Sequence, residues 1–382
     1  MAKSRLTLDV LWKVLLVITL LIFGLVHASS ILIPLIFSLF IAVLLNPMVS
    51  FLERRIKFPK ILAILTVLIV VFITVSAAIY FMSSQAKGLL EDLPSMVTKF
   101  NSLVEEIGKK LYSITGLSAD EQINFIKKNS GKILSSSSFI LTSTFYFTTS
   151  FIASITLVPI YVFFFLLYKA NFKKFLLNLG KENKSRHAIE IAEEVSDMVQ
   201  AYIVGLLIVT SIIALLNIIG LLSLGIKYAV FLAIFSSILT VIPYVGILLG
   251  GSLSVLVALI TTDSLFYPLG VVAIYSFVQF LEGNLITPKV IGSKVNVNPM
   301  AAIIALIIGG KIWGILGMVI AIPLTGVLKI IFSHYPRLQP YAILLQSTDK
   351  DSEQEDLKKL RERRKEKRLN RKEKLKKKEE LL

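Results

Sequence analysis

Eight long runs of apolar residues constrain the fold of this chain more than any other feature of its sequence. A helix needs about 20 apolar residues to cross the roughly 30 Å of hydrocarbon in a bilayer. Lipid cannot bond to open backbone groups, and no run alternates as a barrel strand would, so each run must be helical. The sequence therefore predicts an all-α polytopic membrane protein with about eight transmembrane segments. The runs are 6–26, 31–52, 61–82, 139–168, 198–222, 228–262, 264–287 and 299–331.

The composition agrees with a surface that faces lipid. Of 382 residues, 55% are apolar and only 17% are charged, a balance that a water-facing surface does not accommodate. The net charge of +16 is typical of nucleic-acid-binding proteins, but the basic residues lie in short loops and in one C-terminal tail. From Asp349 onward that tail has no aromatic residues on which bases could stack, so nucleic acid is disfavoured as a partner.

The distribution of basic residues predicts the orientation in the membrane. Lys and Arg near the ends of spans resist translocation. They collect at Lys3 and Arg5, at 54–60 between the second and third runs, and at 169–186 after the fourth run. Alternating spans place these three groups on one side, so we expect them, and both termini, to be cytoplasmic.

The segments between the runs divide the chain into five regions. Apolar residues recur at three- and four-residue steps between Leu89 and Leu111, which predicts an amphipathic helix on the membrane surface or on a neighbouring subunit. A short cytoplasmic helix is expected just before the fifth run. The regions are the first three helices (1–84), an extracytoplasmic amphipathic segment (85–138), the fourth helix with a cytoplasmic helix (139–197), a transport core with broken helices (198–335) and a basic cytoplasmic tail (336–382).

The C-terminal tail changes abruptly in composition from Asp349 onward. Between residues 357 and 382 there are fourteen basic and five acidic residues, which can form a helix but no core. Anionic lipid attracts such a segment by about 1 kcal/mol for each charge near the surface. We expect the tail to be solvated or to contact anionic lipid.

Two of the apolar runs are too long for one ordinary span. The run 228–262 is interrupted by Pro243-Tyr244-Val245-Gly246, and the run 299–331 by the sequence from Gly309 to Gly314. As re-entrant hairpins, these runs would bring exposed backbone to the middle of the membrane, where transporters contact their solutes. The alternative is a single kinked and tilted helix in each place.

Glu282 is the clearest charged residue at membrane depth. A charge inside a span costs several kcal/mol and is normally retained for a function. Gln279 lies one helical turn before it, on roughly the same face. A carboxylate that alternately binds a proton or a cation would suit coupled transport, whereas the alternative is a structural hydrogen bond to a neighbouring helix. Asn217, in the fifth run, is interpreted as a helix-to-helix hydrogen bond.

Motifs for catalysis and metal binding are missing from the sequence. It has no cysteine, no phosphate-binding GxxxxGK[ST] loop and no HExxH helix, and its three histidines are scattered. We therefore expect no metal, no cofactor and no enzymatic activity.

Nearly the whole membrane region resembles the autoinducer-2 exporter (AI-2E) family of bacterial permeases, and the C-terminal third is the specific part of the resemblance. The resemblance is carried by Asn217, by the Ile242–Gly246 sequence IPYVG, by residues 279–292 (QFLEGNLITPKVIG), by Asn298-Pro299 and by 314–323. It implies a multi-pass permease of the bacterial inner membrane that exports a small metabolite such as autoinducer-2. The resemblance also implies a homo-oligomer, for which a pentamer is one candidate. The basic tail departs from the short ends of this family.

The resemblance leaves other functions open. Some relatives resemble sodium or lithium to proton antiporters, and a membrane scaffold that acts through the basic tail is a further alternative. Together, the motifs and the two interrupted runs define a predicted transport path. It comprises Pro243, Tyr244, Gly246, Gln279, Glu282, Asn284, Pro288, Pro299, Gly309, Gly310 and Lys311, with Glu282 as the coupling residue.

Overall fold

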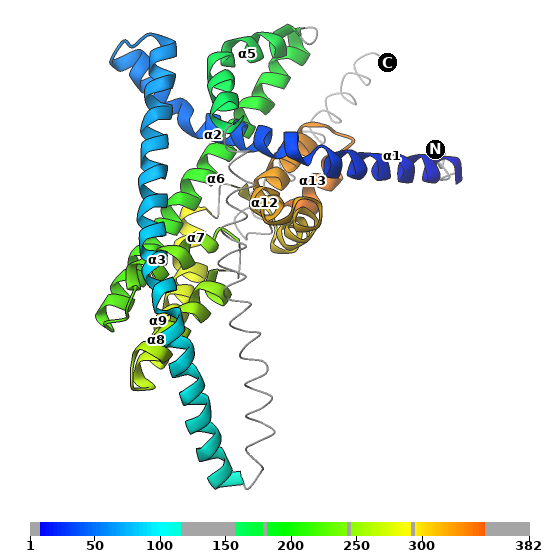
Figure 1. Ribbon diagram of the computed structural model, residues 1–382. Coiled ribbons are helices and arrows are strands. Elements are labelled where there is room, and N and C mark those ends of the chain that lie inside the picture. Colours follow the sequence, from blue (N-terminus) through cyan, green and yellow to red (C-terminus); the bar gives the residue numbers. More distant parts are fainter. Residues whose placement is uncertain (1–7, 116–156, 179–181, 243–245, 292–294, 348–382) are drawn as a thin grey trace, which may run out of the picture.

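Helices form the entire regular structure of the part of the chain described here (Figure 1). In this computed structural model, the only β pairing among the described residues is a single bridge between Val297 and Gln346. The prediction of an all-α polytopic membrane protein is confirmed, and five of these helices are long and apolar enough to cross a membrane. The described residues are 8–115, 157–178, 182–242, 246–291 and 295–347.

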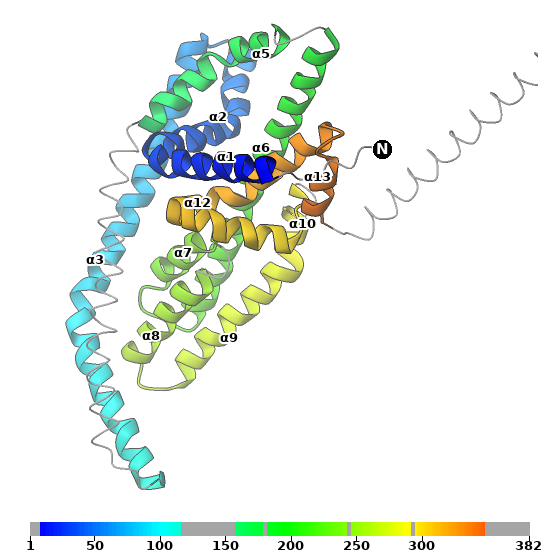
Figure 2. The same cartoon turned by 90° about the vertical axis from the view of Figure 1, so that its right-hand side faces the viewer.

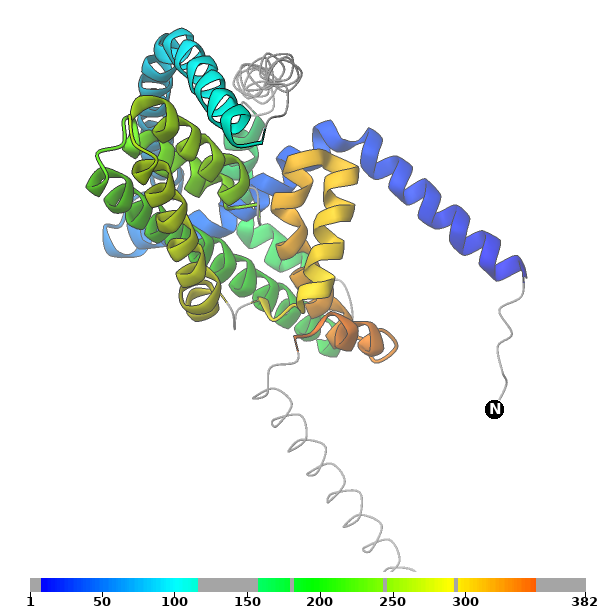
Figure 3. The same cartoon turned by 90° about the horizontal axis from the view of Figure 1, so that it is seen from below.

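The first two helices correspond to the first two apolar runs. Helix α1 (Leu8–His27) extends away from the rest of the molecule, as Figure 3 shows, and α2 (Ser29–Arg55) packs among the other helices. Large side chains of α1 such as Leu20 and Phe23 are about 60% exposed (61% and 59%). A helix that is apolar on all sides and packs on little protein is suited to a lipid environment.

The third run and the amphipathic segment form one continuous helix. Helix α3 (Lys60–Thr115) has 56 residues and is about 84 Å long at 1.5 Å per residue. The helix runs without a break from the span into the amphipathic stretch, although it contains Gly88 and Pro94. The predicted amphipathic helix therefore continues the span along the same helix, and its contact with the membrane surface or a neighbouring subunit stays a prediction.

Part of the amphipathic stripe packs within its own subunit. Leu89 and Met96 are buried in a core formed with residues of the 221–275 region. Polar contacts flank this core: Lys227 and Tyr228 both bond to the carboxylate of Asp92. The hydrogen bond to Asp92 also raises the pKa of the Lys227 ammonium group above its ordinary value. The lower half of α3 is thereby attached to the transport core.

The helix at Leu157–Leu167 belongs to the fourth run, whose earlier residues lie outside the described part of the chain. It packs against α2 and α3 and is followed by α5 (Lys169–Asn178). Helix α6 (Glu182–Ser223) joins the predicted cytoplasmic helix to the fifth span without a break. At 42 residues, α6 is about 63 Å long, so it also extends beyond the hydrocarbon.

The run 228–262 folds back on itself. Helix α7 (Ala229–Leu239) is followed by a π-helical segment, η1 (Gly246–Gly251), and by α8 (Ser252–Thr261). A Cβ atom added at Gly250 would collide with Ser236 of α7, so the returning segment lies directly on α7. Figure 2 shows α7 and α8 next to each other. The hairpin interpretation is correct, and a single kinked helix is excluded.

The run 299–331 is also a hairpin. Helix α12 (Pro299–His334) is broken at Trp313 and Gly314, where Gly314 has φ 61° and ψ −143°, a conformation that favours glycine. Its two legs lie side by side in Figure 3. A Cβ atom at Gly309 would lie 2.5 Å from the carbonyl oxygen of Gly317. The turn is therefore at Gly314, the last residue of the predicted Gly309–Gly314 interruption, whereas Gly309 and Gly310 lie within the first leg and make close contacts with the second leg.

The seventh run forms a helix with an internal π turn. Helix α9 (Phe266–Leu281) continues into η2 (Glu282–Ile286) and α10 (Thr287–Val290). The short helix α13 (Gln339–Leu345) follows α12 and packs against it. Helices α6, α7, α9 and α12 thus surround the point where the π turn places Glu282.

The contact between Gly309 and Gly317 makes a testable prediction about stability. The substitution Gly309→Ala should lower the free energy of unfolding by about 1 to 3 kcal/mol, because the added methyl group overpacks the hairpin. The matched control is Gly24→Ala in α1, where no atom lies within 4 Å of the new Cβ. That variant should be as stable as the parent or slightly more stable. Thermal unfolding in detergent compares them, and equal melting temperatures would show that the legs of α12 separate.

Candidate functional site

Two neighbouring cavities lie in the transport core and share two lining residues, Thr240 and Glu282. The larger cavity has a volume of about 230 Å³, and the smaller one about 10 Å³. The smaller volume is close to the minimum that admits one water molecule. Glu282 therefore stands at the boundary between a chamber for a small solute and a space for a single water or ion.

The larger cavity is formed where α6, the end of α7, the η2–α10 segment and α12 meet. Most of its wall is apolar, with a few polar groups that could orient a solute, as is usual for small-molecule sites. Its lining residues are Tyr202, Leu206, Val209, Thr210, Thr240, Val241, Glu282, Thr287, Ile291, Val295, Asn296, Val297, Ala302 and Ile322.

The smaller cavity has a more polar wall. Its polar side chains are two amides, three hydroxyl groups and one carboxyl group, which come from four different elements. Its lining residues are Ile213, Asn217, Ser236, Thr240, Gly246, Ile247, Tyr275, Val278, Gln279 and Glu282.

The hydroxyl groups beside the smaller cavity bond to one another. The Tyr275 hydroxyl donates to Ser236 Oγ at 3.0 Å and lies 2.8 Å from Ser254 Oγ. Ser236 and Ser254 in turn donate to the carbonyl groups of Ala233 and Gly250. This network connects both legs of the first hairpin to α9. Its buried polar atoms are satisfied, as buried hydroxyl groups normally are.

Asn217 differs from this network. Its side chain is only 1% exposed, and its Oδ1 atom has no hydrogen-bond partner within the described part of the chain. An unpaired buried acceptor costs about 1 to 3 kcal/mol. The residue lines the smaller cavity, so a water or a ligand there could bond to it. The interpretation of Asn217 as a helix-to-helix hydrogen bond finds no such bond among the described residues.

Glu282 lacks a basic neighbour in the site. No lysine or arginine is present among the residues that line either cavity. The residue begins the π turn η2, and such turns are frequent at functional sites because they interrupt the regular helical hydrogen bonds. A carboxylate at membrane depth without a basic partner is stabilised by a proton or by a bound cation. The geometry therefore suits reversible binding of one positive charge.

Glycine determines how closely the first hairpin approaches α7. A Cβ atom at Gly246 would lie 2.7 Å from the carbonyl oxygen of Ser236 and would also collide with Thr240. Only a residue without a side chain allows this approach. The position of Thr240 between the cavities thus depends on Gly246.

The structure brings three of the predicted path residues together. Gly246, Gln279 and Glu282 all line the smaller cavity. Pro243 and Tyr244 lie outside the described residues, so their part in the path stays a prediction.

Three other predicted residues lie away from the cavities. The side chain of Asn284 is exposed and donates to the carbonyl of Phe280 at 2.8 Å. Pro288 is exposed on α10, and Pro299 starts α12 directly after Asn298, whose side chain caps the helix. Helix geometry accounts for both prolines. Their role in transport stays a prediction without support from the cavity geometry.

The glycine-rich segment of α12 also lies apart from the cavities. Gly309 packs against Gly317, and Gly310 lies next to Met318, so both glycines hold the hairpin together. Lys311 is exposed close to the turn. None of the three lines either cavity.

Sequence reasoning missed most of the polar residues of the site. They are hydroxyl and amide side chains that are common in membrane helices, and only their convergence in space marks them. Their signal in the sequence is weak: each is a polar residue within or next to an apolar run. They are Tyr202, Thr210, Ser236, Thr240, Tyr275, Thr287 and Asn296.

Comparison with known proteins identifies the family. The profile of the AI-2E family transporters matches residues 14–337, which is most of the chain and includes every residue of both cavities. The chain belongs to the AI-2E transporter family. AI-2E family membership confirms the resemblance seen in the C-terminal third and shows that this chain is a membrane transporter.

Curated relatives of this AI-2E transporter cover nearly the same length. The putative transport protein YueF of Bacillus subtilis is 29% identical over 323 residues, which are 82% of this chain and 86% of the relative. YrrI of the same organism, also a putative transport protein, is 27% identical over 322 residues, 81% and 88% of the two chains. The AI-2 transport protein TqsA of Escherichia coli is 24% identical over 355 residues, 92% of this chain and all of the relative.

The unpaired Asn217 yields a prediction about stability. The substitution Asn217→Leu should leave the free energy of unfolding unchanged or raise it by about 1 kcal/mol, because it removes a buried acceptor without a partner. The control is Ser211→Ala, on an exposed position of the same helix. Thermal unfolding of both variants in detergent makes the comparison. A loss of several degrees in Asn217→Leu alone would mean that Asn217 is bonded in the folded protein.

Proposed function

We propose that this AI-2E transporter exports a small polar metabolite through the two cavities that meet at Glu282. The observation that carries the proposal is the position of Glu282. Its carboxyl group lines both cavities, on a π turn inside an apolar span, with no basic residue in either wall. The name of the relative TqsA includes transport of AI-2, which makes autoinducer-2 the first solute to test.

The dimensions of the larger cavity support a small solute. Its volume of about 230 Å³ is below the range of about 300 to 1,000 Å³ that is usual for drug-sized ligands. Hydroxyl groups of Thr210, Thr240 and Thr287 and the amide of Asn296 are available in its wall. These groups can bond to a hydroxylated metabolite, and the surrounding apolar side chains exclude water from it.

Two hairpins provide the element that could open and close this path. The hairpin of α7, η1 and α8 supplies Thr240, Val241 and Gly246, and the hairpin of α12 supplies Ala302 and Ile322. Half-length helices that meet at a solute site are a recurrent feature of secondary transporters. A displacement of either hairpin would change the access to Glu282.

The protein is further proposed to reside in the inner membrane as a homo-oligomer with both termini in the cytoplasm. Basic residues at 54–60 and 169–186 support this orientation. The basic tail is proposed to contact anionic lipid and to make no essential contribution to the path, because the cavities are formed entirely by residues before it.

The first test of this function is the substitution Glu282→Gln. Removing the titrating carboxyl group while keeping the size of the side chain should lower efflux of labelled autoinducer-2 from loaded right-side-out vesicles at least about tenfold, since a charge in a desolvated path is worth several kcal/mol. The matched control is Glu91→Gln, because Glu91 is an exposed residue of α3. Equal flux in Glu282→Gln and the parent, at equal protein level, would remove Glu282 from the path.

A second function, exchange of a monovalent cation for protons, is favoured by the smaller cavity. The Oδ1 atom of Asn217 and the carboxylate of Glu282 are two acceptors without a basic partner in one ion-sized space. A small dehydrated cation would satisfy both, and a proton on Glu282 would displace it.

This second function has its own measurement. In vesicles with an imposed pH gradient, addition of sodium should dissipate the gradient in the parent, and Asn217→Leu should suppress the effect because a cation ligand is lost. The Ser211→Ala variant serves as the control. A gradient that is insensitive to sodium and lithium would exclude antiport and leave the export function untouched.

A further inference from the structure

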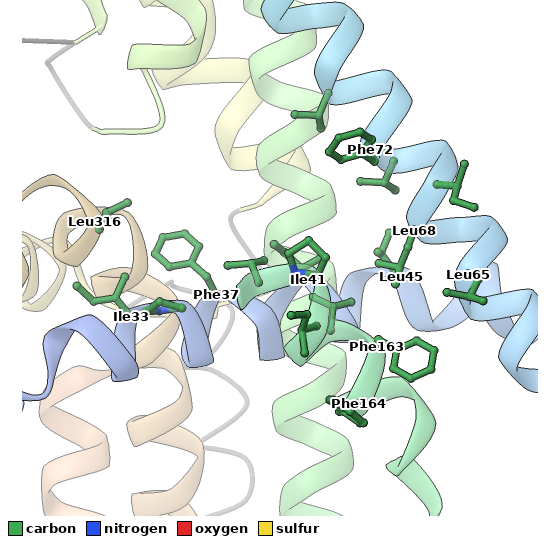
Figure 4. A pocket seen from close by; sticks show the side chains of 18 residues that line it. Ile33, Phe37, Ile41, Leu45, Leu65, Leu68, Phe72, Phe163, Phe164 and Leu316 are labelled. Carbon is green, nitrogen blue, oxygen red and sulfur yellow. The ribbon is translucent and has the colours of Figure 1, made fainter. Parts of the chain in front are cut away.

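A large apolar groove is lined mainly by helices that do not line these cavities, and α12 is the element that contributes to both the groove and the larger cavity. Figure 4 shows it between α2, α3 and the helix at Leu157–Leu167. Its volume is about 730 Å³, and all 18 side chains that line it are apolar. It offers no hydrogen-bonding side chain, so a polar metabolite would lose its bonds to water there without replacement.

The groove has the depth of one lipid leaflet. Along α3, its lining runs from Leu65 to Val75, which is about 15 Å at 1.5 Å per residue. The hydrocarbon of a bilayer is about 30 Å thick, so one leaflet measures about half of that. The groove therefore matches the extent of an acyl chain.

Basic residues stand at one end of the groove. Lys60 lies five residues before Leu65, and its ammonium group donates to the carbonyl of Leu167 at 2.5 Å. Lys169 lies five residues after Phe164 and contacts Asn46 at 3.1 Å and Glu53 at 3.7 Å. Five helical residues correspond to about 7.5 Å along the helix axis, so both lysines lie about one and a half turns beyond the nearest residue of the apolar wall.

The charge at this end is not balanced. Three more basic residues lie at this end: Arg54 and Arg55 in the last turn of α2, and Lys57 in the loop between α2 and α3. They are exposed and form no ion pair with any residue that the structure describes. Glu53 is the acid that neutralises Lys169. Figures 1 and 2 both place this loop at the same end of the molecule as α5. An anion at this end would meet a surplus of positive charge.

We propose that the groove binds an anionic phospholipid, with an acyl chain between α2, α3 and the 157–167 helix and its phosphate beside Lys60 and Lys169. Both parts of the site require this occupant. The apolar wall is complementary to an acyl chain, and the basic residues at its end are complementary to the negative charge of the phosphate. A transmembrane helix of a second copy would fill the groove without supplying that charge.

The lipid would also contact the transport core. Leu316, the second residue after the turn of the α12 hairpin, completes the wall of the groove. A bound acyl chain would therefore bridge the N-terminal helices and the hairpin that contributes Ala302 and Ile322 to the larger cavity.

The experiment compares lipid retention by the full-length protein. Parent and variants are reconstituted in vesicles of equal parts phosphatidylglycerol and phosphatidylcholine and extracted in mild detergent. Native mass spectrometry then identifies the lipids that remain bound to each protein. The parent should retain phosphatidylglycerol in preference to phosphatidylcholine. The double variant Lys60→Gln, Lys169→Gln should reduce this preference about tenfold or more, because two charges near the phosphate are lost.

A second variant tests the apolar wall. The substitution Ile69→Trp should abolish retention of both lipids, because Ile69 lines the groove and a larger ring fills it. The matched controls are Ile73→Trp, one turn further along α3 and outside the groove, and Lys173→Gln, which is paired with Glu193. Both controls should retain lipid as the parent does.

Several results would overturn the proposal. They are equal retention of the two lipids by the parent, unchanged retention in Ile69→Trp, or the same loss in Ile73→Trp as in Ile69→Trp. A fourth is a change from oligomer to monomer in Ile69→Trp with lipid retention unchanged, which would assign the groove to a second copy of the chain. Melting temperatures of all variants verify that they are folded.

Discussion

The arrangement of the helices in this protein depends on one requirement: backbone N–H and C=O groups cannot form hydrogen bonds with lipid, so protein must satisfy them. Each break in an apolar helix exposes amides and carbonyl groups, and hydrocarbon cannot satisfy them. The chain solves this by folding the broken segments onto other helices: η1 lies on α7, and the two legs of α12 lie on each other. Glycines at these contacts allow the backbones to approach closely. The returning segment η1 is covered by α7, and the space beside it forms part of the smaller cavity.

The same requirement separates structural polar groups from functional ones. Ser236, Ser254 and Tyr275 satisfy one another and hold the first hairpin to α9. Asn217 Oδ1 has no partner among the described residues, and Glu282, which is hydrogen-bonded to Gln279, has no basic partner among the residues that line the cavities. A carboxyl group at membrane depth without a basic partner is normally retained for a function. This difference is why transport through the Glu282 region is the function that the site supports best in a member of the AI-2E family.

Lipid acts on this protein both as solvent and as a ligand. Helix α1 and the outer faces of α2 and α3 expose apolar side chains that only hydrocarbon can cover. The groove beneath Lys60 and Lys169 adds a place where shape and charge select one kind of lipid. The parts of α3 and α6 beyond the hydrocarbon are held instead by ion pairs such as Lys99 with Asp263 at 2.7 Å and Lys173 with Glu193 at 3.1 Å.

The sequence by itself determined the class of fold, because length and hydropathy decide whether a helix can cross a bilayer, and it singled out Glu282 because a charge in such a helix is costly. It also located the two interrupted runs, but it could not choose between a kink and a hairpin. Only the tertiary structure decided that both runs fold back, that α12 turns at Gly314, and that Thr240, Tyr275 and Asn217 meet Glu282. Hydropathy is a property of each segment, whereas contact between distant segments depends on how closely their backbones pack.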